Sequence, residues 1–400
     1  MNDSLRLSAA LFALFAAGCS GENAADAAAP SGKGGGDGAL QTRAAPPASE
    51  GATALAVETL AEGLVNPWSI AFLPEGDILV TERAGRLRII RDGALLPEPA
   101  AGVPPVQTGG QAGLFDIVPH PDFAENRTVF LAYAHGTAEE NATRVARARF
   151  DGAALTDVEV IYEAKPLKDS SGHYGGRIVI APDGTLFVTI GEGSRYKERA
   201  QVMSSSFGAV IRINQDGSIP ADNPSFGEGS LPELWTKGHR NPQGLAYDAA
   251  RGVLWEHEHG PRGGDEINII EKGANYGWPL ASYGIDYNGA KITPFTEYEG
   301  TAQPFKYWTP SIGPSGLAVY TGDLFAGWSG DLLVGAMAEG VGEALHRIDL
   351  DESGREIGEE RYLVGERIRD VRVGPDGAIY VTTEDRQGAP VGKVLRLTPQ

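Results

Sequence analysis

Short segments in which hydrophobic and polar residues alternate recur along the chain from about residue 54 onward. Three of them consist of a strand-like stretch, a Pro-Asp-Gly or Pro-Glu-Gly turn and a second stretch rich in β-branched or aromatic residues: residues 69–81, 177–189 and 370–382. Looser copies occupy residues 113–133, 243–256 and 315–334. Alternation with a period of two indicates strands that bury one face, and a glycine-containing turn between two of them is typical of a β-hairpin.

Six such hairpins predict an all-β fold. Their spacing of roughly 45 to 70 residues is at or above that of propeller blades, and the chain lacks the long periodic helices of a βα fold. We therefore expect a six-bladed β-propeller with loops gathered at one end of a central channel. Residues 393–397 are expected to pair with residues 55–60 and close the ring.

The composition limits the partners. The 400 residues are 42% hydrophobic, enough for a large core, and 34 basic against 53 acidic residues give a net charge of −19. This charge argues against nucleic acid or an anionic membrane surface as a partner. An anionic ligand must therefore be held by a local basic pocket.

The N-terminal region indicates export. Residues 5–18 read LRLSAALFALFAAG, an apolar run too short to span a bilayer and placed like a signal-peptide core. It leads to Cys19, the only cysteine, as in a bacterial lipoprotein cleavage site; simple signal cleavage is the alternative. We expect a signal peptide with a lipobox over residues 1–19, a flexible Gly/Ala/Pro-rich linker over 20–53 and the propeller over 54–400. The expected location is the periplasm or outer envelope, with attachment to the membrane by lipid on Cys19.

Residues 233–279 hold more special residues than core packing requires. Arg240 offers a fork of donors suited to carboxylate or phosphate. The Gly-Pro turn at Gly260 and Pro261 leaves backbone carbonyls free, and with Glu266 and Tyr276 it supplies hard oxygen ligands that suit calcium. The stretch thus predicts a calcium site beside an anion clamp, and a surface loop between strands is the alternative.

The sequence resembles the soluble quinoprotein glucose and sorbosone dehydrogenase family, most closely its aldose sugar dehydrogenase branch. The resemblance covers about residues 54–397 and rests on six motifs in the family's order: GQAGLFDIVPHPDF, HYGGR, GHRNPQG, HGPRGGDEIN, NYGWP and RIRDVRVGPDG. It implies a propeller that binds pyrroloquinoline quinone (PQQ) and calcium and oxidises the anomeric carbon of aldoses to lactones.

The resemblance implies that His173 is the general base. An imidazole suits removal of the proton from the sugar C1 hydroxyl while hydride passes to the quinone. Glu192 stands where the family usually has an aspartate that orients this histidine. The alternatives are a structural histidine and a solvated loop glutamate.

Cofactor contacts are implied for several further residues. PQQ carries three carboxylates, which explains the use of arginine. Arg367 and Arg369 are two positions apart on a strand, so both side chains point to one face; surface salt bridges are the alternative. The implied set is Gln111, Arg240, Asn241, Tyr287, Trp308, Arg367 and Arg369.

Two further points concern the cofactor surroundings. Trp308 would lie over the flat cofactor, where the alternative is a buried blade tryptophan. The family also has a lysine near the cofactor, yet no lysine occurs between Leu332 and Ile348.

The resemblance implies two calcium ions. The carbonyls of Gly260 and Pro261 would hold the ion that polarises the quinone carbonyl. Glu266 and Tyr276 would hold a second, structural ion, and a turn cap and a core tyrosine are the alternatives.

The expected partners are an aldose substrate and an electron acceptor, either a membrane quinone or a cytochrome. The family includes monomers and dimers, and we expect a monomer. Two other functions remain open. One is a calcium-dependent lactonase-type propeller hydrolase, which would need no arginine cluster. The other is a non-catalytic cell-surface propeller that serves as a binding module.

Overall fold

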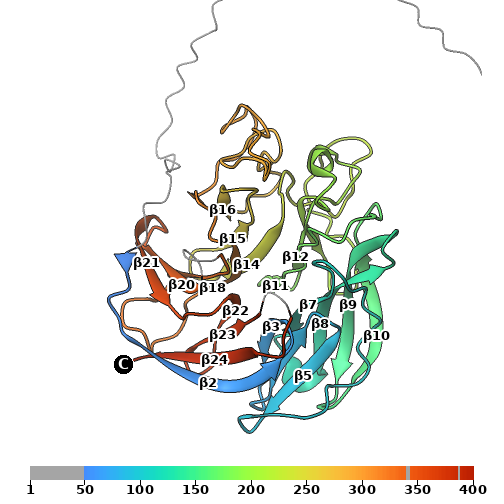
Figure 1. Ribbon diagram of the computed structural model, residues 1–400. Helices are drawn as coiled ribbons and strands as arrows, with labels where there is room; N and C mark the ends of the chain where they lie inside the picture. The colour runs from blue at the N-terminus through green and yellow to red at the C-terminus, as the bar shows by residue number, and fades with distance from the viewer. Residues whose placement is uncertain (1–48, 339–342, 386–387) are drawn as a thin grey trace, which may run out of the picture. The chain divides into compact units, whose positions relative to one another are not determined.

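Six sheets, in which strands that follow one another in sequence pair antiparallel, are the blades of a β-propeller (Figure 1). The first three blades contain β3 (Pro67–Phe72), β4 (Ile78–Glu82), β5 (Arg86–Arg91) and β6 (Ala94–Leu95); β7 (Leu114–Pro119), β8 (Thr128–Gly136), β9 (Asn141–Phe150) and β10 (Leu155–Glu163); and β11 (Ile178–Ile180), β12 (Leu186–Ile190) and β13 (Ala209–Ile213).

The fourth and fifth blades complete the set of sheets formed from consecutive strands. They contain β14 (Pro242–Asp248), β15 (Val253–Glu258), β16 (Asp265–Ile269) and β17 (Lys306–Trp308); and β18 (Pro314–Val319), β19 (Leu332–Ala336), β20 (Ala344–Leu350) and β21 (Glu356–Leu363). Helical structure in the described residues is limited to α1 (Phe123–Asn126) and the 3-10 turn η1 (Lys197–Gln201).

The sixth blade joins the two ends of the propeller. It contains β22 (Ile368–Val373), β23 (Ile379–Thr383), β24 (Gly392–Pro399) and, from the start of the domain, β2 (Leu55–Leu64). Val57 lies opposite Leu397 in this pairing, and Figure 1 shows β2 beside β24. The expected closure between the first and last strands is therefore confirmed.

The computed structural model describes residues 49–338, 343–385 and 388–400. The expected signal peptide, Cys19 and most of the expected linker lie outside the described residues. Strand β1 (Ser49–Glu50) lies parallel to β21 and falls inside the segment that composition predicts to be a linker. Among the residues described, no helix is both long and apolar enough to cross a membrane.

Each of the six predicted hairpins forms the first two strands of a blade. The turns follow from local chemistry. In the turn between β11 and β12, Gly184 has a φ of +82° and its N–H donates to the carbonyl of Ala181. A side chain would be strained at that φ, so glycine fixes the turn and the register of the strands beside it.

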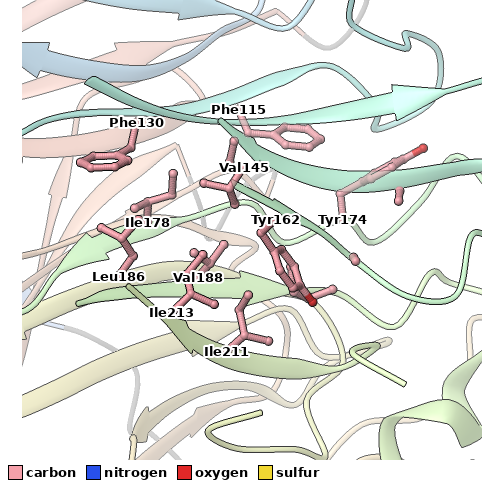
Figure 2. Close-up of a cluster of buried hydrophobic side chains, with 14 of the residues drawn as sticks. Phe115, Phe130, Val145, Tyr162, Tyr174, Ile178, Leu186, Val188, Ile211 and Ile213 are labelled. Atoms are coloured by element: carbon pink, nitrogen blue, oxygen red, sulfur yellow. The ribbon is translucent and has the colours of Figure 1, made fainter. Parts of the chain in front are cut away.

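Hydrophobic residues fill the space between neighbouring blades. In the described residues there are six buried clusters, one for each pair of adjacent blades. Figure 2 shows the one between the second and third blades, with the labelled side chains Phe115, Phe130, Val145, Tyr162, Tyr174, Ile178, Leu186, Val188, Ile211 and Ile213. Each strand alternates its side chains between the two faces of its sheet, so both faces of a blade can pack against the neighbouring blades.

A buried ion-pair network ties the innermost strands together. Arg177 is 1% exposed, and its guanidinium donates to Asp370 Oδ1 (2.9 Å) and to the carbonyl of Gln243 (3.0 Å). It also lies 3.5 Å from Asp116 Oδ1 and packs over the ring of Trp68. It also donates to the carbonyl of Ser315 (3.4 Å). Arg177 directly precedes β11 of the third blade, so its side chain contacts the other five blades.

Arg372 completes the charge balance of this network. Its side chain donates to Asp116 Oδ1 (2.8 Å) and Asp370 Oδ2 (3.0 Å). Two buried aspartates therefore face two arginines, and each charge has a partner of the opposite sign.

Candidate active site

One cavity of about 310 Å³ lies at the end of the propeller where the first strand of each blade begins and its second strand ends. Antiparallel pairing brings these two kinds of strand end to the same rim, so loops from every blade reach the cavity. Its size lies within the usual range for small-molecule sites. The lining residues are Asn66, Trp68, Arg83, Gln111, Phe115, Tyr174, Gly175, Asn241, Gln243, His259, Met337, Arg367, Arg369, Glu384 and Asp385.

Four residues expected from the sequence to contact the cofactor meet at this cavity: Gln111, Asn241, Arg367 and Arg369. Both arginines reach Glu384: Arg367 at 3.1 Å, and Arg369 through two nitrogens at 2.9 and 3.1 Å. Burial would raise the pKa of Glu384, but Arg369 and Arg367 hold it below its ordinary value. The expectation that both arginines point to one face is thus met.

His173 is held beside the cavity in a strained conformation. Its φ is +48°, and its backbone N–H donates to Gln111 Oε1 (2.8 Å). A Cβ at Gly191 would lie 2.4 Å from the carbonyl oxygen of His173, so a glycine is required for this close approach. Backbone strain at a non-glycine residue is typical of functional sites.

The imidazole of His173 pairs with Glu192. Nδ1 lies 2.8 Å from Glu192 Oε1, and both side chains are buried. Because a carboxylate only accepts, Nδ1 carries the proton and Nε2 keeps its lone pair. Burial, with Arg240 and Lys168 nearby, lowers the pKa of His173, although Glu192 acts in the opposite direction. The ring is therefore neutral at pH 7 and able to accept a proton.

A second hollow of about 430 Å³ adjoins the first. Gln111 lines both, and His173 falls between Gly172, which lines the second, and Tyr174, which lines the first. The walls of the second hollow carry hydroxyl, carboxylate and guanidinium groups, including Ser194 and Arg195. Such groups suit a polyhydroxylated ligand.

The residues expected to bind calcium surround a small cavity of about 20 Å³, which has room for one ion or one water. It is lined by Gly260, Pro261, Glu266 and Tyr276, which the sequence assigns to two separate ions, and also by Glu258. Two carboxylates and backbone carbonyls are hard oxygen donors, so this set fits calcium.

One detail of the calcium expectation needs correction. The phenol of Tyr276 donates to Ile269 O (2.5 Å) and accepts from the N–H of Glu271 (2.9 Å), so its oxygen is already engaged. Tyr276 can therefore offer an ion only its backbone carbonyl. Similarly, Arg240 donates to the carbonyl of Gly260 (2.7 Å), which leaves that oxygen one further lone pair.

Three expected cofactor residues do not line the main cavity. Arg240 lines the small cavity instead, where its guanidinium donates to the carbonyls of His259 (3.0 Å) and Gly260 (2.7 Å). Trp308 is buried in the cluster between the fourth and fifth blades, and its indole N–H donates to Glu359 Oε1 (3.1 Å). It does not line the main cavity. Tyr287 is 70% exposed and lines a neighbouring hollow of about 230 Å³ that shares Arg367 and Met337 with the main cavity.

Several site residues were not anticipated from the sequence. Arg83 and Glu384 line the main cavity, and Glu258 lines the small one. Glu258 also belongs to a buried group with His239 and Glu256, whose ligand atoms lie within 4.8 Å of one another. Arg83 and Glu384 each directly follow the second strand of a blade. A charged residue at this position is the sequence signal that could have located both of them.

The fold and the site together define a class of protein: a six-bladed propeller with a buried histidine–carboxylate pair and an arginine-rich cavity at one end of its channel. The chain belongs to the Glucose / Sorbosone dehydrogenase family, whose model matches residues 64–396. The membership expected from the sequence motifs is thereby confirmed.

Three similar proteins illustrate the relationship. The chain is 40% identical to the aldose sugar dehydrogenase YliI of Escherichia coli, over 86% of this chain and 93% of that protein. The crystal structure of the soluble aldose sugar dehydrogenase of Escherichia coli in its apo form has a TM-score of 0.81 at 39% identity, covering 87% of this chain and 100% of that one. The PQQ-bound form of the aldose sugar dehydrogenase of Streptomyces coelicolor has a TM-score of 0.69 at 26% identity, covering 87% and 99%.

Proposed function

We propose that the protein is a PQQ- and calcium-dependent dehydrogenase that oxidises aldoses at C1 to aldonolactones. The observation that carries the proposal is the neutral His173, oriented by Glu192, at the edge of a cavity lined with arginines. The family membership and the PQQ-bound relative support the same class of reaction.

The cavity fits PQQ by the chemistry of its walls. Arg367 and Arg369 present guanidinium groups that match carboxylates, and Asn241 and Gln111 add amide hydrogen-bonding groups. When bound there, PQQ would supply the quinone that accepts hydride from the sugar.

His173 is proposed to act as the general base. Nε2 would accept the proton of the C1 hydroxyl, while the bond from Nδ1 to Glu192 holds the ring in the required tautomer. The hollow lined by Ser194 and Arg195 would hold the sugar beside this nitrogen. Glu192 would also stabilise the imidazolium that forms, because its carboxylate is buried against the ring.

The decisive experiment is reconstitution of the purified full-length chain, assayed by dye reduction on a panel of aldoses. We expect activity only when PQQ and calcium are both added, with the aldonolactone as product. Absence of turnover on every aldose, together with no change in the PQQ absorbance on mixing, would reject the proposal in favour of a non-catalytic binding module. Hydrolysis of lactones without PQQ would favour the hydrolase instead.

Glu192→Gln should change the pH dependence as well as the rate. Glu192 raises the pKa of His173, so the glutamine variant should move the acidic limb of kcat/KM to lower pH. The rate at pH 8 should fall by roughly 10- to 100-fold, since an amide can hold the wrong tautomer. A pH profile of both proteins tests this. A limb that moves to higher pH would contradict the assignment.

The affinity of the protein for calcium is expected to depend on Glu266. Glu266→Gln is expected to weaken calcium binding by at least about tenfold, because one carboxylate charge is lost from a small buried site. Isothermal titration of the chelator-treated protein measures the effect, and exposed Glu299→Gln is the matched control. Equal affinity in the two variants would place the ion elsewhere.

We also propose that the enzyme acts in the periplasm or outer envelope and passes electrons to a membrane quinone or a cytochrome. The signal-like N-terminus supports this location. Fractionation of cells that express the chain, with and without Cys19→Ala, distinguishes lipid attachment from simple signal cleavage.

A further inference from the structure

Arg83 occupies a fixed place on the rim of the main cavity. It follows β4 directly, its backbone N–H donates to Asn66 O (3.1 Å) and its carbonyl accepts from the N–H of Leu114 (3.1 Å). The second of these bonds joins the first and second blades at the rim of the cavity. The backbone position from which the side chain projects is therefore set by the scaffold and not by a loose loop.

The guanidinium of Arg83 differs from those of its neighbours. Arg367 and Arg369 both hydrogen-bond Glu384, whereas no such bond joins Glu384 to Arg83 among the described residues. Nε of Arg83, like Nε of Arg367, is buried without a hydrogen-bond partner in the part of the chain that the structure describes, so the difference between the two lies in the bond to Glu384. Buried donors are nearly always paired in folded proteins, so an unpaired one that lines a cavity points to a missing acceptor.

The electrostatic surroundings indicate the charge of that acceptor. Arg83, Arg367 and Arg369 converge on one side of the cavity, and Glu384 is the carboxylate that two of them share. Burial and the positive charges of Arg369 and Arg367 lower the pKa of Arg83, and Glu384 offsets them only partly. An anion with a planar carboxylate would satisfy both the charge and the fork geometry of arginine.

We propose that Arg83 binds a carboxylate of PQQ and is a cofactor-positioning residue of this site, an inference that rests on the proposed function. It acts alongside Arg367 and Arg369, which remain paired with Glu384. Arg83 contributes to holding the cofactor and takes no part in proton transfer.

The test is the dissociation constant of PQQ for the full-length protein in the presence of calcium, measured by equilibrium dialysis. Arg83→Gln should weaken binding by roughly 10- to 100-fold, and Arg83→Lys should recover part of the loss because it restores charge without the fork. Arg355→Gln removes an arginine that is 67% exposed and should leave the affinity unchanged. The melting temperature of the cofactor-free proteins shows whether Arg83→Gln still folds.

The outcomes separate this inference from the function on which it rests. If the unmodified protein binds PQQ and Arg83→Gln and Arg83→Lys bind it equally well, Arg83 has no such role and the proposed function stands. If the unmodified protein does not bind PQQ, the proposed function fails and this inference fails with it. Weak binding by Arg83→Gln with partial recovery by lysine supports the proposal.

Discussion

Replacing His173 with alanine is expected to lower kcat by about 10²- to 10⁴-fold, the usual contribution of a general base. The affinity for PQQ should change little, because the arginines and amides that line the cavity remain in place. The expectation depends on the protonation state of one ring: Nδ1 is committed to Glu192, so Nε2 is the nitrogen able to take a proton.

Measurement of both quantities separates catalysis from folding. Dye reduction under saturating sugar gives kcat, and dialysis gives the dissociation constant of PQQ. His135→Ala is the matched control, since His135 lies at the partly exposed end of β8 and lines neither of the two adjoining hollows. Unchanged turnover in His173→Ala would remove the proposed base, and a lost affinity for PQQ would show that His173 supports the cavity instead.

The pH dependence of the unmodified protein follows from the same environment. The pKa of His173 is lowered in the folded state, so the base stays neutral at pH values where a free imidazole would be protonated. The acidic limb of the activity profile should thus lie below pH 6.5. The sign for stability is the same: as pH falls through the pKa of the unfolded chain, the unfolded state gains a proton that the folded state resists, and stability decreases.

The blade pattern could be predicted from the sequence because its causes are local. Alternation and turn glycines such as Gly184 act within a few residues, and all six predicted hairpins form the first two strands of a blade. The alignment of Arg367 with Arg369 is local in the same sense, since Arg369 lies in β22 and Arg367 directly precedes this strand, two positions away.

Residues whose role depends on partners from distant blades could not be assigned in this way. Trp308 has the sequence surroundings of a site residue, yet its place is decided by Glu359, which accepts its N–H from the next blade. The phenol of Tyr276 likewise donates its hydrogen bond to the carbonyl of Ile269, which lies away from the main cavity. Arg83 stands in an ordinary strand-end context, and only the closure of the ring brings it beside Arg369. The positive charge that the resemblance expects from a lysine between Leu332 and Ile348 is thus available from another blade.

Arg177→Met is expected to destabilise the folded protein by about 3–5 kcal/mol. The variant removes one charge from a balanced buried set and leaves the carboxylates of Asp116 and Asp370 with Arg372 alone. An uncompensated buried charge is far more unfavourable than the loss of an exposed pair, and breaking a buried pair by removing one partner has effects of this size. Denaturant unfolding followed by tryptophan fluorescence measures the difference, provided the transition is two-state.

The matched control is Arg355→Met, which breaks an exposed pair with Asp351 and should change stability far less than Arg177→Met does. A similar small change in Arg177→Met would show that the blades hold together through their hydrophobic clusters alone. A large loss of stability in Arg177→Met should be accompanied by a disturbance of the active site. Trp68 and Gln243 both contact Arg177 and both line the main cavity, so the network that joins the blades forms its floor. Loss of Arg177 is therefore expected to weaken PQQ binding even where the variant remains folded.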